Sequence, residues 1–173
     1  MQFLKHLYYG NGKGKTTAAL GLALRAAGSG MRVHLVQFLK GGETGELAAL
    51  EKFDNITVSR CDRNYGFSFR MSENDKSEIT ECHNSIFTEA MKLANNGNIN
   101  MIVLDEIVDA WNLDLIDRKL VTDFILQKPK AEIVMTGHEP EKIFIDAADY
   151  VSEIKAVKHP FEKGIGARRG IEY

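Results

Sequence analysis

Short apolar runs alternate along the chain with longer segments whose apolar residues recur at helical spacing. The runs are rich in β-branched or aromatic residues and end at glycine or polar residues, as buried strands do. They predict strands over 3–9, 32–39, 56–59, 100–104, 132–136 and 150–155. The intervening segments predict helices from Gly14 to Gly28 and over 75–96, 115–126 and 141–148.

This alternation predicts an α/β fold. Right-handed crossovers then give a mostly parallel sheet with helices on both faces, and ligands bind at the carboxyl ends of the strands. Residues 40–46 and 61–72 remain irregular, and loops of such length are usually functional or disordered. A chain of 173 residues has room for one core, so we expect residues 1–173 to form a single domain.

Composition and charge exclude several classes of partner. With 22 Lys and Arg against 24 Asp and Glu the chain lacks a broad basic field, so nucleic acid is not expected. No apolar run approaches the ~20 residues that span a bilayer, and no basic-then-apolar leader follows Met1. We therefore expect a cytoplasmic protein without a membrane partner.

Cys61 and Cys82 form no CxxC pair, so neither a disulfide framework nor a thiolate metal site is expected.

A glycine-rich segment, YGNGKGKTT at 9–17, lies between the first strand and the first helix. Its glycines let successive backbone N–H groups face anionic oxygens, and the helix N-terminus adds partial positive charge. Lys15 would reach the phosphates and the Thr16 hydroxyl would bind Mg²⁺.

The pattern GxxxxGK[ST] is met except that Tyr9 replaces its first glycine. A plain turn with surface lysines is the alternative, but the strand–loop–helix context favours a P-loop NTPase-like, RecA-like domain. The predicted nucleotide-binding residues are Gly10, Asn11, Gly12, Lys13, Gly14, Lys15, Thr16 and Thr17.

Two carboxylates, Asp105 and Glu106, end the predicted strand over 100–104. Consecutive strand residues point to opposite faces, so we expect Asp105 to bind Mg²⁺, directly or through water, and Glu106 to face the reacting end. The alternative is that one of them caps the next segment. A hydrolytic enzyme would also need a positioned water and often an arginine, for which Arg168 and Arg169 are candidates.

Further candidates follow other predicted strands. Lys40-Gly41 and Thr136-Gly137 stand at strand ends where substrates of parallel sheets bind, with ordinary turns as the alternative. His138 is either a site residue or a polar residue at a helix entry. The aromatic residues of 61–72 either pack beneath the loop or contact a large flat ligand: Tyr65, Phe67 and Phe69.

These residues resemble the P-loop ATP:corrinoid adenosyltransferases over nearly the whole chain. The resemblance is carried by GNGKGKTTAALGLALRAAGSG, VQFLKGG with Gly45-Glu46, Gly66-Phe67, VLDE, Thr136-Gly137 and the block from Ala147 to Tyr173. It implies transfer of the 5′-deoxyadenosyl group of ATP to the Co(I) of a reduced corrinoid, with release of triphosphate, in cobalamin biosynthesis or salvage. The product would be adenosylcobalamin or adenosylcobyrinic acid a,c-diamide.

The resemblance also implies roles. Residues 10–17 would hold the triphosphate, Lys15, Thr16 and Glu106 would be catalytic, and Thr16, Asp105 and Glu106 would position Mg²⁺. Phe67 and Phe69 would lie near the lower face of the corrin, although well-known members have Trp at position 69 and frequently Arg at position 138. A homodimer and a flavoprotein reductant are the implied partners. A nucleotide hydrolase or small-molecule kinase, and a nucleotide-gated switch without turnover, remain alternatives.

Overall fold

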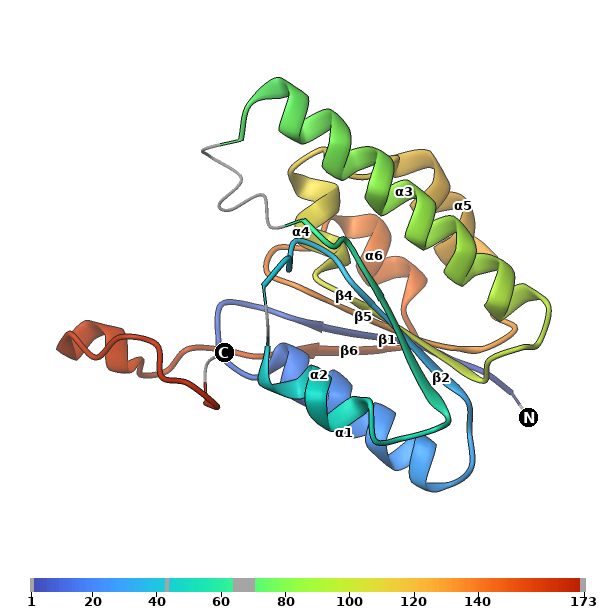
Figure 1. Cartoon of the computed structure of the whole chain (residues 1–173), viewed down its shortest axis with the longest axis horizontal. Helices are drawn as coiled ribbons and strands as arrows, with labels where there is room; N and C mark the ends of the chain where they lie inside the picture. Colours follow the sequence, from blue (N-terminus) through green and yellow to red (C-terminus); the bar gives the residue numbers. More distant parts are fainter. Residues whose placement is uncertain (1, 43, 64–70, 172–173) are drawn as a thin grey trace.

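The computed structural model describes residues 2–42, 44–63 and 71–171. In this part of the chain all strands pair in parallel in one sheet of order β3-β2-β4-β5-β1-β6 (Figure 1). The predicted α/β class with a parallel sheet is confirmed. The strands are β1 (Lys5–Tyr9), β2 (Val33–Gln37), β3 (Ile56–Arg60), β4 (Met101–Asp105), β5 (Glu132–Gly137) and β6 (Tyr150–Glu153).

Helices cover both faces of the sheet, as Figure 1 shows. One face carries α1 (Lys15–Gly28) and α2 (Gly45–Leu50), and the other carries α3 (Glu73–Asn95), α4 (Ile107–Asn112), α5 (Arg118–Leu126) and α6 (Lys142–Ala147). Alternate residues of the central strand β4 enter two separate cores: Val103 packs with Ala19 and Ala23 of α1, whereas Leu104 packs with Phe87 of α3. Burial on both faces explains why β4 has no polar residue before Asp105.

The helix boundaries differ from the predicted ones where caps decide them. α3 begins at Glu73 because Ser72 and Asp75 form a reciprocal capping box. α5 begins at Arg118, not near Leu115, because the Asp117 side chain accepts hydrogen bonds from the first-turn N–H groups. The six-residue helices α2 and α4 were not predicted, since so few residues show no helical period.

The two cysteines are paired, so the expectation of no disulfide is wrong. Cys61, directly after β3, bonds to Cys82 of α3, with the sulfur atoms 2.12 Å apart. The spacing of 21 residues did not suggest a bond, because only the folding of α3 over the end of β3 brings the two together. Disulfides are typical of oxidising compartments, so the cytoplasmic location stays a prediction. Within the described residues, no helix is long and apolar enough to cross a membrane.

The strand order determines which loops meet. β5 lies between β1, which precedes the glycine-rich loop, and β4, which ends in Asp105. Because all of these strands are parallel, the segments after β1, β2, β4 and β5 lie along one edge of the sheet. After β6 the chain forms a C-terminal segment, residues 154–171, which contains a short 3-10 helix, η2 (Pro160–Lys163), and extends beyond the sheet in Figure 1.

Candidate nucleotide-binding site

The glycine-rich loop is held against the beginning of the C-terminal segment. Gly10 has φ 116°, and a Cβ there would lie 2.4 Å from the Ile154 carbonyl oxygen. The Gly12 N–H donates to that same oxygen at 2.8 Å, and the Asn11 side chain accepts a hydrogen bond of 3.0 Å from the Ala156 N–H. Gly10 and Gly12 are thus required by close backbone contact, in addition to any contact with phosphate.

The loop leads into an N-terminus of α1 that no side chain caps. Gly14, at φ 114°, is the N-cap residue and offers no side chain to the first-turn N–H groups. Such groups form an anion site when left open. The Lys15 ammonium donates to the Gly12 carbonyl at 2.9 Å. Burial lowers the pKa of Lys15, while Asp109, Glu106 and Asp105 act to raise it.

Asp105 is the centre of the polar contacts at this edge of the sheet. It is fully buried, and its Oδ1 accepts hydrogen bonds from the hydroxyls of Thr16 at 2.9 Å and Thr136 at 2.8 Å. The Thr136 hydroxyl in turn accepts from the Glu106 N–H at 2.8 Å. Thr136 therefore supports the Asp105 carboxylate and the Glu106 backbone by hydrogen bonds, and its predicted contact with a substrate stays a prediction.

Lys40 joins the two acidic residues. Its ammonium donates to Asp105 Oδ2 at 2.7 Å and lies 3.7 Å from Glu106 Oε1, 3.9 Å from Glu46 Oε1 and 3.5 Å from Thr16 Oγ1. Burial alone would lower the pKa of Lys40, but the nearby carboxylates outweigh it and raise the pKa. Lys40 therefore stays charged, at the point where the phosphate loop and the carboxylates meet.

Glu106 does not continue the strand. β4 ends at Asp105, and Glu106 takes the left-handed conformation (φ 63°) as the N-cap residue of α4. The expectation that the two carboxylates point to opposite faces is therefore wrong, and both reach Lys40. Burial raises the pKa of Glu106 to about 7, with Asp105 and Asp109 adding to the rise and Lys40 and Lys15 opposing it. A non-glycine residue in this conformation costs energy, and such strain is concentrated at functional sites.

Two residues at this edge were missed as site residues. Asp109, one helical turn beyond Glu106, accepts hydrogen bonds from the His138 N–H at 3.3 Å and from the His138 ring at 3.0 Å. Glu46, in the first turn of α2, accepts from the Gln37 side chain at 3.2 Å. The spacing of three residues from Glu106 could have indicated Asp109.

The predicted site residue Gly137 has a packing role. A Cβ at Gly137 would lie 2.4 Å from Val108 Cβ, so Gly137 is a close-packing position between β5 and α4.

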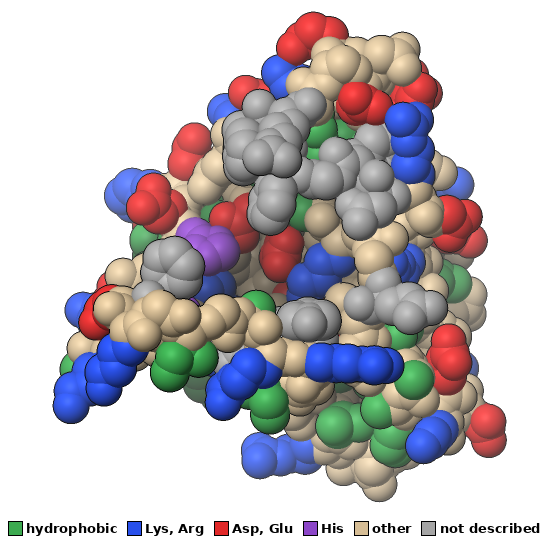
Figure 2. All heavy atoms as spheres, turned by 60° about the vertical axis from the view of Figure 1, so that its left-hand side comes forward, with side chains coloured by type: hydrophobic (Ala, Val, Ile, Leu, Met, Phe, Trp, Pro, Cys, Tyr) green, Lys and Arg blue, Asp and Glu red, His purple; other side chains and the backbone are tan. Residues whose placement is uncertain are grey.

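These side chains border a cavity of about 630 Å³. Its walls come from the glycine-rich loop, α1, α2, the ends of β2 and β4, His138 and the C-terminal segment. Figure 2 shows acidic and basic side chains side by side in a hollow on this face. The lining residues are Lys13, Gly14, Lys15, Thr16, Thr17, Leu20, Gly21, Leu24, Lys40, Gly45, Glu46, Glu106, His138, Gly170 and Ile171. The size is that of a site for a nucleotide-sized ligand.

Other predicted residues lie elsewhere. Gly41 borders a smaller neighbouring cavity with Leu39 and His83. Tyr65, Phe67 and Phe69 lie outside the described residues, so the predicted contact of these aromatic residues with a large flat ligand, and of Phe67 and Phe69 with a corrin, stays a prediction. Gly170 and Ile171 also border the nucleotide cavity and were not predicted as site residues.

The oxygen atoms of Thr16 and Asp105 fit a magnesium ion bound together with nucleotide phosphates. Among the described residues no group of three or more His, Cys, Asp or Glu side chains could hold a metal by itself. Mg²⁺ in nucleotide sites needs only one or two protein oxygen ligands, because phosphates and water supply the rest. The Thr16 hydroxyl and the Asp105 carboxylate, 2.9 Å apart, meet that requirement.

A parallel α/β sheet, an uncapped glycine-rich helix N-terminus and a buried carboxylate beside its threonine define a P-loop nucleotide-binding protein. The model of the family "ATP:corrinoid adenosyltransferase BtuR/CobO/CobP" matches residues 2–173. The chain is 33% identical to the corrinoid adenosyltransferase of Escherichia coli K12, covering 96% of this chain and 84% of that protein. It is 34% identical to the corrinoid adenosyltransferase of Pseudomonas aeruginosa, covering 96% and 82% respectively. The chain belongs to the ATP:corrinoid adenosyltransferase family.

Proposed function

We propose that this protein transfers the 5′-deoxyadenosyl group of ATP to the Co(I) of a reduced corrinoid and releases triphosphate. Family membership over residues 2–173 supports an adenosyltransferase that acts on corrinoids. The observation that carries the nucleotide half of the proposal is the convergence of Thr16, Lys40 and Asp105 beside the open N-terminus of α1.

In the proposed reaction the Co(I) electron pair attacks the 5′ carbon of ATP. The cobalt–carbon bond forms as the bond from the 5′ carbon to the phosphate oxygen breaks, and the electrons of that bond leave with triphosphate. Cobalt is formally oxidised to Co(III), and no other oxidant or reductant is needed in this step. Because the nucleophile is already strong, the protein has mainly to align the reactants and stabilise the leaving group.

Each part of the site has a role in stabilising that leaving group. The first-turn N–H groups of α1, Lys15 and Lys40 would offset the negative charge that develops on triphosphate. Thr16 and Asp105 would hold Mg²⁺, which supplies further charge compensation when bound, and Glu106 would complete its surroundings. Phe67 and Phe69 would face the corrin, and the reductant that prepares Co(I) would be a flavoprotein.

The remaining assignments are also proposals. We propose that residues 1–173 act as one domain, that the protein forms a homodimer, and that the corrinoid is cobalamin or cobyrinic acid a,c-diamide. The alternative class is a nucleotide hydrolase or kinase, which would use the same phosphate loop and the same Asp105.

An anaerobic assay with chemically reduced cob(I)alamin, ATP and Mg²⁺ tests the proposal. The expected products are light-sensitive adenosylcobalamin and stoichiometric triphosphate, and Lys15→Ala should abolish their formation. ADP and phosphate without a cobalt–carbon bond would overturn the adenosyl transfer and favour the hydrolase. Tight ATP binding without any turnover would favour a nucleotide-gated switch.

A further inference from the structure

His83 of α3 is buried between the β2 end and the loop before α5. It is 1% exposed and contacts the Phe38 ring edge-on, with the ring centres 5.2 Å apart. Its Nδ1 lies 2.8 Å from the Leu115 carbonyl oxygen, which can only accept a hydrogen bond, so Nδ1 carries the proton. Its Nε2 is then the acceptor for the Leu39 N–H at 3.3 Å. Both ring nitrogens are therefore used by backbone groups.

Leu39 has an uncommon backbone conformation. Its φ is 60°, in the left-handed region, which is sterically unfavourable for a residue with a Cβ. The residue before it is tied to the site, since the Phe38 N–H donates to the Asp105 carbonyl at 3.0 Å. The residue after it is Lys40, whose ammonium returns to the Asp105 side chain. The residues on both sides of Leu39 are therefore bonded to Asp105, Phe38 through its backbone N–H and Lys40 through its side chain.

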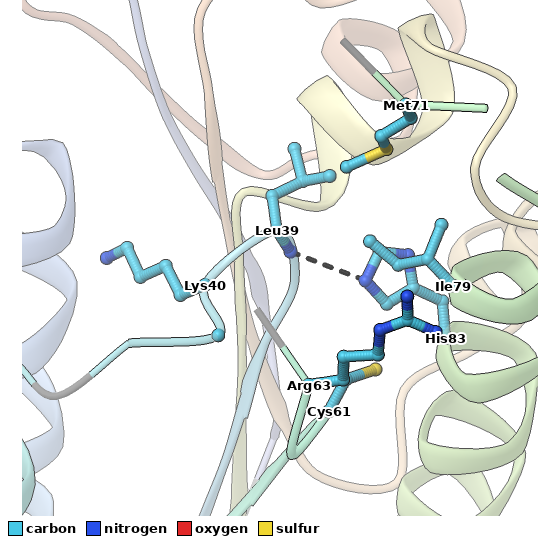
Figure 3. Close-up of a pocket in the computed structure, with 8 residues that line it drawn as sticks. Leu39, Lys40, Cys61, Arg63, Met71, Ile79 and His83 are labelled. Atoms are coloured by element: carbon cyan, nitrogen blue, oxygen red, sulfur yellow. Dashed lines mark hydrogen bonds between the residues drawn. The ribbon is translucent and has the colours of Figure 1, made fainter. Parts of the chain in front are cut away.

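Figure 3 shows that the turn directs the side chains of Leu39 and Lys40 to opposite sides. The Leu39 side chain points toward Met71, on the same side as His83, whereas the Lys40 side chain points away toward α1. The dashed line marks the hydrogen bond from the Leu39 N–H to the His83 ring, at the residue where the two side chains diverge. The adjacent Cys82 is bonded to Cys61 at the end of β3, so the α3 backbone that carries His83 is itself anchored to the sheet.

We propose that His83 is a positioning residue of the nucleotide site: its Nε2 holds the Leu39 N–H, and thereby the left-handed turn that aims Lys40 at Asp105 and at the triphosphate of ATP. The proposal rests on the proposed function for the identity of the ligand. It extends the site to a side chain that does not border the nucleotide cavity and acts only through the backbone.

Two substitutions separate the two hydrogen bonds of the ring. In His83→Gln the amide oxygen can take the place of Nε2 and accept from the Leu39 N–H, while the bond to Leu115 is lost. In His83→Asn the amide nitrogen can take the place of Nδ1 and donate to Leu115, while the acceptor for Leu39 is lost. A merely structural role predicts similar losses in both variants. The proposed role predicts that Gln preserves the function of Lys40 and Asn does not.

The measurement is the affinity for inorganic triphosphate with Mg²⁺, by titration calorimetry, followed by the rate of adenosylcobalamin formation. Lys40→Met should weaken triphosphate binding about tenfold, which corresponds to about 1.4 kcal/mol. His83→Asn should approach that loss and His83→Gln should stay near the wild type. In the double variant His83→Asn/Lys40→Met the loss should not exceed that of Lys40→Met, because His83 acts through Lys40.

Equal losses in the Gln and Asn variants, or additive losses in the double variant, would overturn the proposal. If His83→Asn does not fold, His83→Leu, which removes both hydrogen bonds and stays apolar, must show the Lys40→Met loss instead, and wild-type affinity in it would also overturn the proposal. Triphosphate binding needs no corrinoid, so failure of the proposed function would appear as absent adenosylation in the wild type while the binding comparison remains valid.

Discussion

The Thr16 hydroxyl donates a hydrogen bond of 2.9 Å to Asp105 Oδ1 and so joins the N-terminus of α1 to the carboxyl end of β4. These residues are 89 positions apart, and β5 separates β4 from the β1 strand that precedes the loop. The hydroxyl and the carboxylate are the protein oxygens beside which a nucleotide-bound magnesium ion would fit. Lys40 holds the other oxygen of the same carboxylate.

Asp105→Asn should weaken ATP binding by lowering the affinity of the site for Mg²⁺. The substitution removes the charge that Lys40 and the proposed ion share, so we expect the Mg²⁺ concentration for half-maximal ATP binding to rise about 10- to 100-fold. Calorimetric titration of ATP at several Mg²⁺ concentrations measures this. Asp123→Asn, which breaks an exposed pair with Lys119 on α5, is the matched control and should change nothing. An unchanged Mg²⁺ requirement in Asp105→Asn would contradict the assignment.

Gly12→Ala should destabilise the glycine-rich loop and displace the C-terminal segment. The added Cβ would lie 2.8 Å from both the Ile154 oxygen and the Lys155 carbonyl carbon, which are backbone atoms and cannot turn aside. We expect a loss of about 1–3 kcal/mol in the free energy of unfolding. Gly28→Ala, at the end of α1 with no atom within 4 Å of the new Cβ, is the control. It should be neutral or stabilising by up to about 1 kcal/mol, and equal losses in both variants would exclude the contact as the cause.

The stability of the protein should fall in acid partly because of His83. Burial lowers the pKa of His83 to about 4, against 6.5 for an exposed histidine. Between these values the unfolded chain binds a proton that the folded chain does not, so stability falls as the pH decreases from 6.5 toward 4. The shift corresponds to a loss of about 3 kcal/mol.

His83→Gln isolates this contribution, because glutamine does not titrate. Glu106, whose pKa of about 7 is raised, acts in the opposite direction in both proteins and cancels in the comparison. Denaturant unfolding at a series of pH values should show wild type losing its advantage over the variant as the pH falls. Parallel curves would mean that His83 does not titrate as the burial indicates.

The Cys61–Cys82 bond should stabilise the fold. Closing a loop of this length restricts the unfolded chain by about 3 kcal/mol on the chain-entropy model. We expect Cys61→Ser/Cys82→Ser to lower the free energy of unfolding by that order, and a reducing agent to do the same to wild type. Mass spectrometry after alkylation of the unreduced protein checks the bond directly. A wild-type protein that takes up two alkyl groups without reduction would show that the bond is absent.

Much of the fold follows from local patterns in the chain. The apolar run from Met101 to Leu104 predicts a strand buried on both faces, and the glycines before Lys15 predict a phosphate loop. Both are properties of a few consecutive residues, so no knowledge of distant contacts is needed. The predicted start of α3 lies two residues inside the observed one, because the capping box of Ser72 and Asp75, and not the helical period, decides where the helix begins.

The sequence by itself determined the class of the fold, the phosphate loop and the pair of acidic residues at the end of β4. Only the tertiary structure decided that Glu106 turns back toward Lys40, that Asp109 pairs with His138, that Ile154 supports the loop, and that Cys61 meets Cys82. The reason is physical. Helical and strand periods depend on neighbours in sequence, whereas these contacts depend on the order of strands in the sheet and on backbone conformations such as the left-handed one of Glu106, which no periodicity encodes.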